Sequence, residues 1–480
     1  MKKLVALLLA MLMLASILPL TALAADELPT LKVLGTWNGH DPNNDPTAKA
    51  IEEKTGYHVE YYMLPAENAV DNLLMQIGSG DHYDILRISE NMYLELLSRN
   101  ALLPLNDMLA QYGGNLTSLI TEEAYSLTTR EGVIYGIPMM AERASISSGI
   151  VLRGDIVKEM NLEIPTNAAE FKDMLMKVHQ AHPELIPFLT QGESKIDVIS
   201  SGFGFYFDWN EVDGELKHYV QLPAYQDYLA YLVDLYNNKL IDQDIAVNNT
   251  TTLTEKFSSR NAFAYACGGW TDGPLTAFIN NNPDIELIYL DPFKDANGNA
   301  GIKKQQALNN VSCIPVTAEH PEEAVKFMNR KLDSDVFTYV TLGVKDETFT
   351  VDENGNYAPI MPIFNELRNN AWWYLNSFDM TCYGDMWMAR TRRTKATGEI
   401  YDGLNKHAAE FARSNPIDLC PTLDAVTRNK QTLETMVKDY VLQVIVGVRK
   451  VEDHPAFVQE WLANGGQETY DAYNNWYKNK

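Results

Sequence analysis

The sequence predicts a mixed α/β protein that begins with a parallel β-sheet. Three short apolar or alternating segments, at residues 31–37, 57–61 and 84–88, are typical of strands. Segments with helical signals separate them. The order strand, helix, strand, helix, strand indicates parallel pairing with helices on the faces of the sheet. Ligands of such sheets bind beyond the carboxyl ends of the strands, so Trp37 and Asn38, at the end of the first strand, are expected at a binding site.

The two helices between these strands have recognisable boundaries. Asp45 is placed to cap a helix that starts at Pro46, because proline is favoured in the first helical turn, and Gly56 ends this helix. In the second helix, residues 70–77 repeat apolar side chains with the spacing of one helical face. The sequence Gly78-Ser79-Gly80 follows and predicts the end of that helix.

The middle of the chain continues the mixed pattern, and the last third becomes mostly helical. Further strands are expected at residues 133–137, 263–268 and 285–290, and helices at residues 167–182, 223–240 and 455–477. Residues 295–299 and 352–356 each contain Asn-Gly, the strongest short signal for a hairpin turn. The sequence contains no long linker, repeat or low-complexity tract, which favours two lobes that share the chain over two separate domains in series.

Residues 1–24 have the features of an export signal. Two lysines supply a positive start, residues 4–18 form a short apolar run, and Ala22-Leu23-Ala24 offers the small-x-small site that signal peptidase cleaves. We expect cleavage after Ala24 and a mature protein outside the cytoplasm, in a periplasm, at the cell surface or secreted. A lipid anchor needs a cysteine at the cleavage site. The first cysteine of the chain is Cys267, so lipid attachment is not expected.

The composition predicts a folded, acidic protein. About 455 residues remain without the signal, enough for two domains, and 46% of the sequence is hydrophobic. The formal charge of −25 disfavours general binding to nucleic acid or to anionic membranes. The four cysteines lack a C-x-x-C motif, and a chain of this size does not need disulfides. Cys267 and Cys313 lie in apolar, strand-like segments and are expected to be buried thiols.

Motifs for catalysis are absent from the sequence, which contains no G-x-S-x-G, no H-E-x-x-H and no P-loop. His179 and His182 are expected at a solvated helix end and not on a metal. Residues 295–299 resemble a calcium loop only superficially, because the glycine is misplaced and the required glutamate is missing. Pairs such as Asp242 and Asp244 are weak evidence for a glycosidase in a chain with 64 acidic residues. We therefore expect no catalytic residue, no metal and no cofactor.

Several tryptophans lie in polar loops and outside apolar periodicity. The examples are Trp37-Asn38, Trp209-Asn210, Trp270 between Gly268-Gly269 and Asp272, and Trp387 near Asp385. An indole face stacks on the C–H face of a sugar ring, while carboxylates and amides bind the hydroxyl groups. Packing in a core or between lobes is the alternative for each of them. Trp372 and Trp373 are adjacent, so at most one of the two is expected to meet a ligand.

Seven segments then occur in an order that matches a known family. They are residues 50–59, 73–85, 100–107, 132–138, 164–171, 257–270 and 461–477. The sequence Gly132-Val-Ile-Tyr-Gly-Ile-Pro138 is one example, and Asn100-Ala-Leu-Leu-Pro-Leu-Asn-Asp107 is another. The chain resembles the extracellular solute-binding proteins of bacterial ABC importers, carbohydrate-type family 1, including their long lipoprotein-like members. The departures are Asn100, where glycine is commoner, and the missing lipobox cysteine.

The resemblance implies the two-lobed type II periplasmic-binding-protein fold, with a hinge, an interlobe cleft and a helix-rich C-terminal part. We expect residues 25–138 and 270–325 in lobe 1, and residues 139–269 and 326–480 in lobe 2. The implied partners are a small-molecule ligand and a membrane permease, and the protein is expected to be a monomer. The aromatic loops favour a mono- or oligosaccharide as the ligand.

Ten residues are expected to bind this ligand: Trp37, Asn38, Asp81, Glu142, Arg143, Trp270, Asp272, Trp373, Asp385 and Trp387. Two other functions remain open. A secreted carbohydrate-active enzyme would need two carboxylates at a set separation across a sugar. A sensor that presents its ligand-bound form to a membrane kinase would use the same closing lobes as a carrier.

Overall fold

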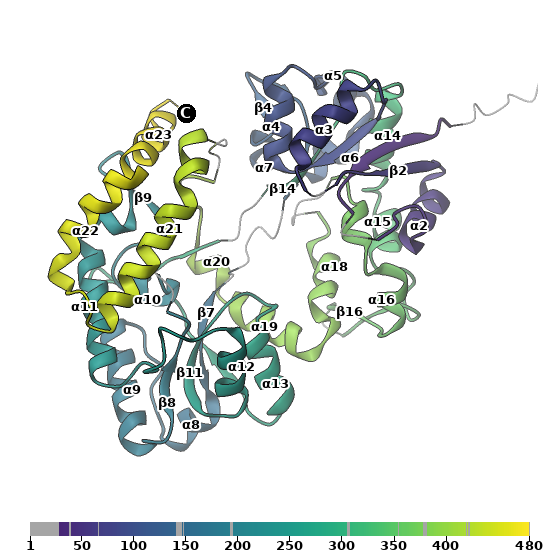
Figure 1. Ribbon diagram of the computed structural model, residues 1–480. Coiled ribbons are helices and arrows are strands. Elements are labelled where there is room, and N and C mark those ends of the chain that lie inside the picture. Colours follow the sequence, from purple (N-terminus) through teal and green to yellow (C-terminus); the bar gives the residue numbers. More distant parts are fainter. Residues whose placement is uncertain are drawn as a thin grey trace, which may run out of the picture.

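The chain forms two lobes, each built around its own β-sheet (Figure 1). The computed structural model describes residues 28–37, 40–65, 67–140, 146, 148–192, 195–304, 308–353, 355–377, 382–418, 420 and 423–479. The expected export signal lies outside the described residues, as do the expected site residues Asn38, Glu142 and Arg143. Within the described part of the chain, no helix combines the length and the apolar character needed to cross a bilayer.

The sheet of the first lobe has the strand order β2-β1-β3-β14-β6. These strands are β1 (Leu31–Gly35), β2 (Val59–Met63), β3 (Ile85–Ile88), β6 (Ile137–Met140) and β14 (Leu308–Cys313). β1 pairs with β2 and with β3 in parallel, which confirms the pairing predicted from the sequence. β14 is antiparallel to both β3 and β6, so β6 runs in the same direction as β1, β2 and β3.

Helices on both faces of this sheet complete the first lobe. They are α2 (Pro46–Thr55), α3 (Ala69–Gly78), α4 (Glu90–Ser98), α5 (Asn106–Tyr112), α6 (Gly114–Leu119), α7 (Glu122–Ser126), α14 (Pro321–Arg330), α15 (Ser334–Thr341), α16 (Ile363–Arg368), α17 (Ala371–Tyr374) and α18 (Gly384–Met388), with the short hairpins β4 (Thr129–Arg130)–β5 (Val133–Ile134) and β15 (Phe349–Val351)–β16 (Tyr357–Pro359). The boundaries of α2 are as predicted. Asp45 accepts a hydrogen bond from the Thr47 amide at 2.7 Å, and Gly56 ends the helix with a φ of 79°, a left-handed conformation that glycine adopts without strain.

The sheet of the second lobe has the strand order β12-β7-β11-β8. Its strands are β7 (Gly149–Arg153), β8 (Ile186–Leu189), β11 (Ala262–Cys267) and β12 (Leu287–Tyr289). β8 and β11 are parallel, and β7 is antiparallel to its two neighbours, β11 and β12. All six residues of β11 are buried, as are the thiols of Cys267 on this strand and of Cys313 on β14, as expected for apolar strands.

The remaining described elements belong to the second lobe. They are α8 (Gly154–Glu159), α9 (Ala168–Ala181), α10 (Asp197–Ser201), β9 (Trp209–Val212), β10 (Glu215–His218), α11 (Pro223–Asn237), α12 (Thr250–Ser258), α13 (Gly273–Asn281), β13 (Ile302–Lys303), α19 (Lys395–Asn405), α20 (Ala408–Phe411), β17 (Ala412–Arg413), α21 (Asp424–Ile445), α22 (His454–Trp461) and α23 (Gln467–Tyr477). The C-terminal helices, yellow in Figure 1, pack on the outer side of this lobe. Trp209 is buried in the same core and contacts Trp461.

The chain passes from one lobe to the other at different residues from those expected from the sequence. α13 and β12, assigned in advance to lobe 1, belong to the second lobe, because Leu275 and Phe278 share a core with Phe257 of α12. α14, which the expected boundary at residue 325 divided between the lobes, and α15, assigned to lobe 2, cover the first sheet, because Phe327 and Phe337 share its core. We therefore place the crossings of the described chain after β6, between β13 and β14, and between α18 and α19.

Candidate functional site

The strand directions bring the carboxyl ends of both sheets to the chain that connects the lobes. In the first lobe, four strands run in the same direction, so their last residues lie along one edge of the sheet. These residues are Gly35, Met63, Ile88 and Met140. The chain leaves this edge at Met140 and enters the second lobe at Gly149. The carboxyl edge of the first sheet is therefore the edge beside the first crossing.

The same reasoning applies to the second sheet. Gly149, the first residue of β7, pairs with Cys267, the last residue of β11. β8 is parallel to β11, so its last residue, Leu189, lies at the same edge. These two carboxyl edges, one in each lobe, are the candidate site, because ligands of α/β sheets bind beyond the carboxyl ends of their strands.

The crossings between the lobes contact one another. Ile146 on the first crossing forms a β-bridge with Lys304 on the second. The amide of Ile146 also donates a hydrogen bond to Oδ1 of Asn405, on the helix that follows the third crossing, at 2.7 Å. The first two crossings are therefore tied to each other and to the C-terminal end of α19, beside the carboxyl edge of the second sheet.

A largely buried ion pair, Lys195–Asp197, lies at the point where the first crossing enters the second lobe. The hydroxyl of Ser148 donates a hydrogen bond to Oδ2 of Asp197 at 2.5 Å, and the ammonium of Lys195 binds the other carboxylate oxygen. Burial alone would raise the pKa of Asp197, but the charge of Lys195 and the two hydrogen bonds outweigh it and hold this pKa below its usual value. Asp197 is therefore a carboxylate, paired with a cation.

At the edge of the first sheet, Trp37 belongs to the core. Its side chain is 1% exposed, its indole N–H donates a hydrogen bond to the Tyr62 carbonyl at 3.0 Å, and its ring lies 5.1 Å from those of Tyr61 and Tyr374. The expectation that Trp37 forms a ligand wall is corrected, because packing between β1, β2 and α17 leaves no indole face for a ligand in this conformation.

Trp373, which was expected to bind the ligand, keeps accessible surface at this edge. It lies on α17 and is half-buried, and the guanidinium carbon of Arg87 lies 5.7 Å from its ring centre. Its neighbour Trp372 packs against Trp387 at 5.0 Å. The next residue, Tyr374, contacts Trp37, which places α17 beside the end of β1.

The other expected residues of the first lobe lie apart from this edge or are covered. Asp81 precedes β3, so it is at the amino end of that strand, and its carboxylate accepts a hydrogen bond from the Ser79 hydroxyl at 3.1 Å. This position is opposite to the carboxyl edge, so Asp81 does not belong to the candidate site, and its contact with a ligand stays an untested prediction. Trp387 is 8% exposed, and Arg390 lies over its ring. Asp385 is exposed in the first turn of α18.

At the edge of the second sheet, Trp270 follows β11 and is half-buried against the neighbouring core. Asp272 holds the loop that carries it. Oδ2 accepts hydrogen bonds from the Gly268 amide at 2.8 Å and the Tyr265 hydroxyl at 3.1 Å, and Oδ1 caps α13 through the Leu275 amide at 2.8 Å. Burial raises the pKa of Asp272, against the effect of these three donors. Asp272 thus positions the loop of Trp270, and its direct contact with a ligand stays a prediction.

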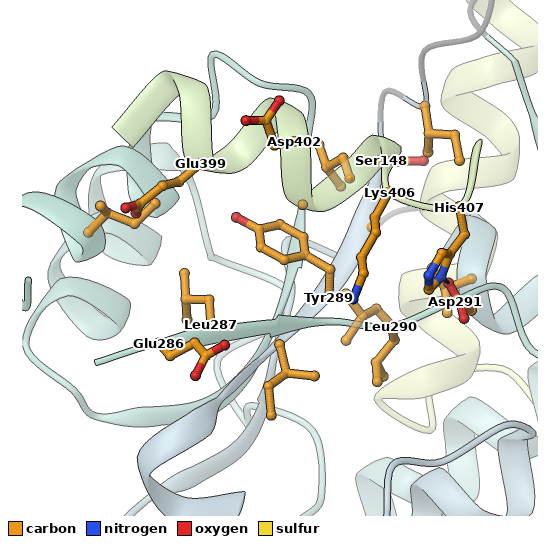
Figure 2. Close-up of a pocket in the computed structure, with 18 of the residues that line it drawn as sticks. Ser148, Glu286, Leu287, Tyr289, Leu290, Asp291, Glu399, Asp402, Lys406 and His407 are labelled. Carbon is orange, nitrogen blue, oxygen red and sulfur yellow. Dashed lines mark hydrogen bonds and ion pairs between the residues drawn. The ribbon is translucent and has the colours of Figure 1, made fainter. Parts of the chain in front are cut away.

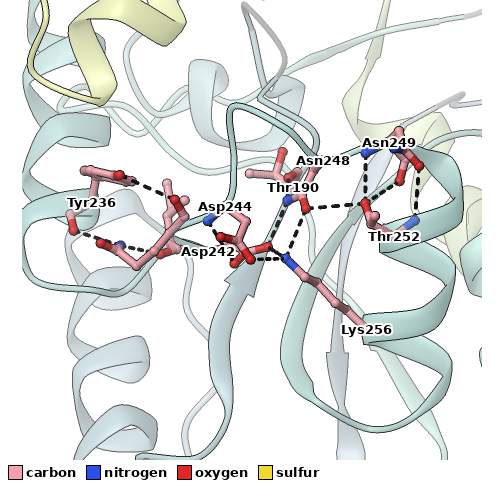
Figure 3. Close-up of polar contacts among 10 residues, drawn as sticks. Thr190, Tyr236, Asp242, Asp244, Asn248, Asn249, Thr252 and Lys256 are labelled. Carbon is pink, nitrogen blue, oxygen red and sulfur yellow. Dashed lines mark hydrogen bonds and ion pairs between the residues drawn. The ribbon is translucent and has the colours of Figure 1, made fainter.

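The polar cluster beside β8 contains the acid pair that the sequence offered for glycosidase chemistry (Figure 3). The ammonium of Lys256 binds Asp242 at 2.6 Å and Asp244 at 3.0 Å. Asn248 joins the cluster by donating hydrogen bonds to Asp242 at 2.8 Å and to the Thr190 carbonyl at 3.0 Å. Lys256 thus pairs with both carboxylates, which are held in one ion-pair network.

A pocket of about 720 Å³ opens in the second lobe between β12 and α19 (Figure 2). Its polar lining includes Tyr289, Glu399 and Asp402, and His407 pairs with Asp291 at 2.6 Å. Lys395 and Arg392 already form ion pairs with Glu399 and Asp402. No motif in the sequence indicated this pocket, because its walls come from segments more than a hundred residues apart.

The described residues contain no group of three or more His, Cys, Asp or Glu side chains arranged for a metal ion. In the loop at 295–299, Oδ1 of Asp295 accepts hydrogen bonds from the amides of Asn297 at 2.9 Å and Asn299 at 2.8 Å. This is a closed turn, but in the described chain no pair of antiparallel strands flanks it, because β12 and β13 belong to different sheets; the hairpin predicted here is therefore wrong. Residues 352–356, by contrast, join the antiparallel strands β15 and β16, which confirms the predicted hairpin.

Known structures share this architecture along almost the whole chain. One is the Streptococcus pneumoniae ABC-transporter substrate-binding protein FusA in complex with kestose, with a TM-score of 0.66, 16% identity, and 94% of this chain and 99% of that chain covered. A human-milk-oligosaccharide (HMO) binding solute-binding protein from Bifidobacterium longum infantis gives a TM-score of 0.68 at 15% identity, covering 94% and 99%. The alginate-binding protein AlgQ2 without calcium ion gives 0.61 at 16% identity, covering 94% and 98%.

The chain therefore has the fold of the solute-binding proteins of ABC importers, and the resemblance and the fold class stated from the sequence are confirmed. By sequence, it belongs to the same family as an uncharacterized protein in the butB 5′ region of Niallia circulans, which is 31% identical over 254 residues, 53% of this chain and 99% of that protein. Lipoprotein LipO of Bacillus subtilis is 21% identical over 481 residues, covering 95% of this chain and 93% of its own. No protein-family model matches the chain.

Proposed function

We propose that the protein is an extracytoplasmic solute-binding protein that captures a mono- or oligosaccharide between its lobes and delivers it to an ABC importer. The observation that carries this proposal is the pair of half-buried tryptophans, Trp373 and Trp270, one beside the carboxyl edge of each sheet. Proteins of similar structure include one in complex with kestose and one for N-glycan transport, which supports a carbohydrate.

Binding and closure follow from this arrangement. A sugar ring offers C–H faces to aromatic side chains and hydroxyl groups to polar ones. Only the closed form contacts the ligand from both lobes, so the ligand shifts the population toward closure about the hinge. The contacts of Ile146 with Lys304 and with Asn405, at the end of α19, are suited to guide such a movement.

We propose that the protein has no enzymatic activity. The acid pair most suggestive of hydrolysis, Asp242 and Asp244, is bound to Lys256. The proteins of similar structure are substrate-binding or solute-binding proteins, which supports the same conclusion. Incubation of the purified protein with any sugar that it binds should leave the sugar intact, as measured by chromatography. Turnover above that of a mock purification would contradict this proposal.

The direct test of function is a thermal-shift panel of neutral oligosaccharides, uronate oligosaccharides and short peptides. A true ligand at 100 times its dissociation constant should stabilise the fold by about 2.7 kcal/mol. Calorimetry should then give one site per chain, and a Trp270→Ala, Trp373→Ala double variant should lose this binding while it melts close to the wild type. Stabilisation by peptides and not by sugars would overturn the proposed ligand class.

We also propose export and removal of residues 1–24. The lysine-rich start, the apolar run and the Ala22-Leu23-Ala24 motif support cleavage after Ala24. Mass spectrometry of the protein produced in a secreting host should find an N-terminus at Ala25 or Asp26. An intact Met1 on membrane-bound protein would contradict this proposal.

A further inference from the structure

Two buried cations lie beneath the helix that carries Trp373. Arg87 on β3 is 1% exposed, and Lys331, at the end of α14, is 3% exposed. Within the described part of the chain, neither forms an ion pair with a carboxylate. Burying a charged group without an opposite charge is costly in free energy, so each of these two side chains needs strong hydrogen-bond acceptors.

That contact is the backbone of the segment from Trp372 to Asn376. The Nε of Arg87 donates to the carbonyl of Leu375 at 2.9 Å, and its Nη2 donates to the carbonyl of Trp372 at 3.2 Å. The last carbonyls of a helix have no partner inside the helix. Arg87 therefore binds the Leu375 carbonyl and strengthens the binding of the Trp372 carbonyl, which otherwise accepts only the long 3.4 Å hydrogen bond from the Leu375 amide, with one rigid, forked group.

Lys331 binds the same segment from a second direction. Its ammonium donates to the carbonyl of Tyr374 at 2.6 Å and also to the side-chain oxygen of Asn376. Burial lowers the pKa of Lys331, and the nearby charge of Arg87 lowers it further. Positive groups at the carboxyl end of a helix are favourable because the exposed carbonyls carry partial negative charge.

These hydrogen bonds fix the backbone on both sides of Trp373, because Arg87 binds the Trp372 carbonyl and Lys331 binds the Tyr374 carbonyl. The guanidinium of Arg87 also lies over the Trp373 ring, at 5.7 Å, within the range of a cation–π contact. The neighbouring Tyr374 is fixed as well, because its hydroxyl donates to the Pro42 carbonyl at 2.8 Å. Trp373 is thus held both through its backbone and through its ring.

We infer that Arg87 and Lys331 are positioning residues that set the orientation of Trp373 at the carboxyl edge of the first sheet. This inference rests on the proposed function only for the ligand that Trp373 meets. The cations do not touch that ligand, because both are buried. They act through the indole, whose orientation determines whether its face is open to a sugar ring.

The first test needs no ligand. In protein labelled with 5-fluorotryptophan, Trp373→Phe identifies the Trp373 ¹⁹F resonance. We expect Arg87→Met and Lys331→Met to shift or broaden this resonance while those of Trp209 and Trp461, in the other lobe, stay in place. The matched control is Arg153→Met, because Arg153 is also buried and donates to a backbone carbonyl, of Arg260, at 2.7 Å in the second lobe. If Arg87→Met and Lys331→Met leave the Trp373 resonance unchanged, the inference is wrong.

The second test measures coupling with the sugar found in the thermal-shift panel. Arg87→Lys keeps the charge but loses the forked contact, and we expect it to weaken binding about threefold to tenfold. In a Trp373→Ala background the same change should have no effect, because Arg87 acts through the indole. An equal loss in both backgrounds would show a general structural role and refute the positioning role. If the wild type binds no sugar, the proposed function fails, and the ¹⁹F result still decides this inference.

Discussion

The two lobes fix their candidate ligand loops with groups of opposite charge. In the second lobe, the carboxylate of Asp272 receives backbone N–H groups and holds the loop of Trp270. In the first lobe, the cations Arg87 and Lys331 donate to backbone carbonyls and hold α17 with Trp373. The difference follows from the end of the helix involved. Trp270 precedes a helix, whose first N–H groups are free, whereas Trp373 lies in the last turn of one, whose carbonyls are free.

The comparison also separates tryptophans that pack from tryptophans that remain accessible. Trp37 and Trp373 lie near the same edge, but β1 and β2 cover the first and α17 presents the second. A variant of each should therefore affect a different measured quantity. Stability should respond at Trp37, and affinity should respond at Trp373 and Trp270.

The largest effect is expected for Trp37→Ala. Removing a buried indole should lower the free energy of unfolding by about 3–5 kcal/mol, through lost burial and the cavity that remains. Urea denaturation followed by circular dichroism measures this change, and Trp37→Phe, which keeps most of the volume, should cost less. A near-normal unfolding midpoint for Trp37→Ala would mean that the indole is not in the core.

The next largest effect is expected at the ion pair beside the first crossing. Asp197→Ala leaves the partly buried ammonium of Lys195 without its closest partner and should cost about 2–3 kcal/mol of stability. The control is the double variant Lys195→Met, Asp197→Leu, which removes both charges and should recover most of the loss. If the double variant is as unstable as the single one, packing and not charge explains the effect.

The same pair predicts a pH dependence. The pKa of Asp197 in the folded protein is below its ordinary value of 3.8, so its contribution is complete above that value and is lost as the pH falls through the folded pKa. The pKa of Lys195 is raised above 10.5, so its contribution is lost only as the pH rises through that higher value. Urea midpoints from pH 2.5 to 7 should fall more steeply at the acid end for the wild type than for the double variant. Parallel curves would contradict this.

A smaller effect, on affinity, is expected for Trp270→Ala. Loss of a stacking face should weaken sugar binding by about 1–3 kcal/mol with little change in melting temperature, because the indole is only half-buried. Titration calorimetry measures the dissociation constant. Trp476→Ala, which changes a half-buried indole on the distant helix α23, is the matched control and should leave the affinity unchanged. Equal affinities of Trp270→Ala and wild type would remove Trp270 from the site.

The sequence predicted local structure well because local signals are short-range. The cap at Asp45, the stop at Gly56 and the hairpin at 352–356 each depend on a few neighbouring residues. The lobe boundaries could not be predicted in the same way. Whether the chain continues in one lobe or crosses to the other after β11 depends on which core receives Phe278, a contact with no local signal.

The candidate site shows the same limit. A tryptophan in a polar loop was expected to face a ligand, but Trp37 reaches back into the core, where Tyr61 and Tyr374 surround it. Arg87 was missed although a signal was present. An arginine inside an apolar strand must find polar partners, and these came from α17, nearly three hundred residues further along the chain.

The smallest effect is expected for Asp81→Ala, and it tests the edge assignment itself. Asp81 is exposed at the amino end of β3, while Trp373 and the end of β1 lie at the carboxyl edge. An exposed side chain with one hydrogen bond, from Ser79, should change the stability by no more than about 0.5 kcal/mol. If sugars bind at the carboxyl edges, the dissociation constant should also stay at the wild-type value, because the β-sheet separates Asp81 from them. A clear loss of affinity in Asp81→Ala, at an unchanged melting temperature, would move the site to the amino end of the sheet and overturn the assignment.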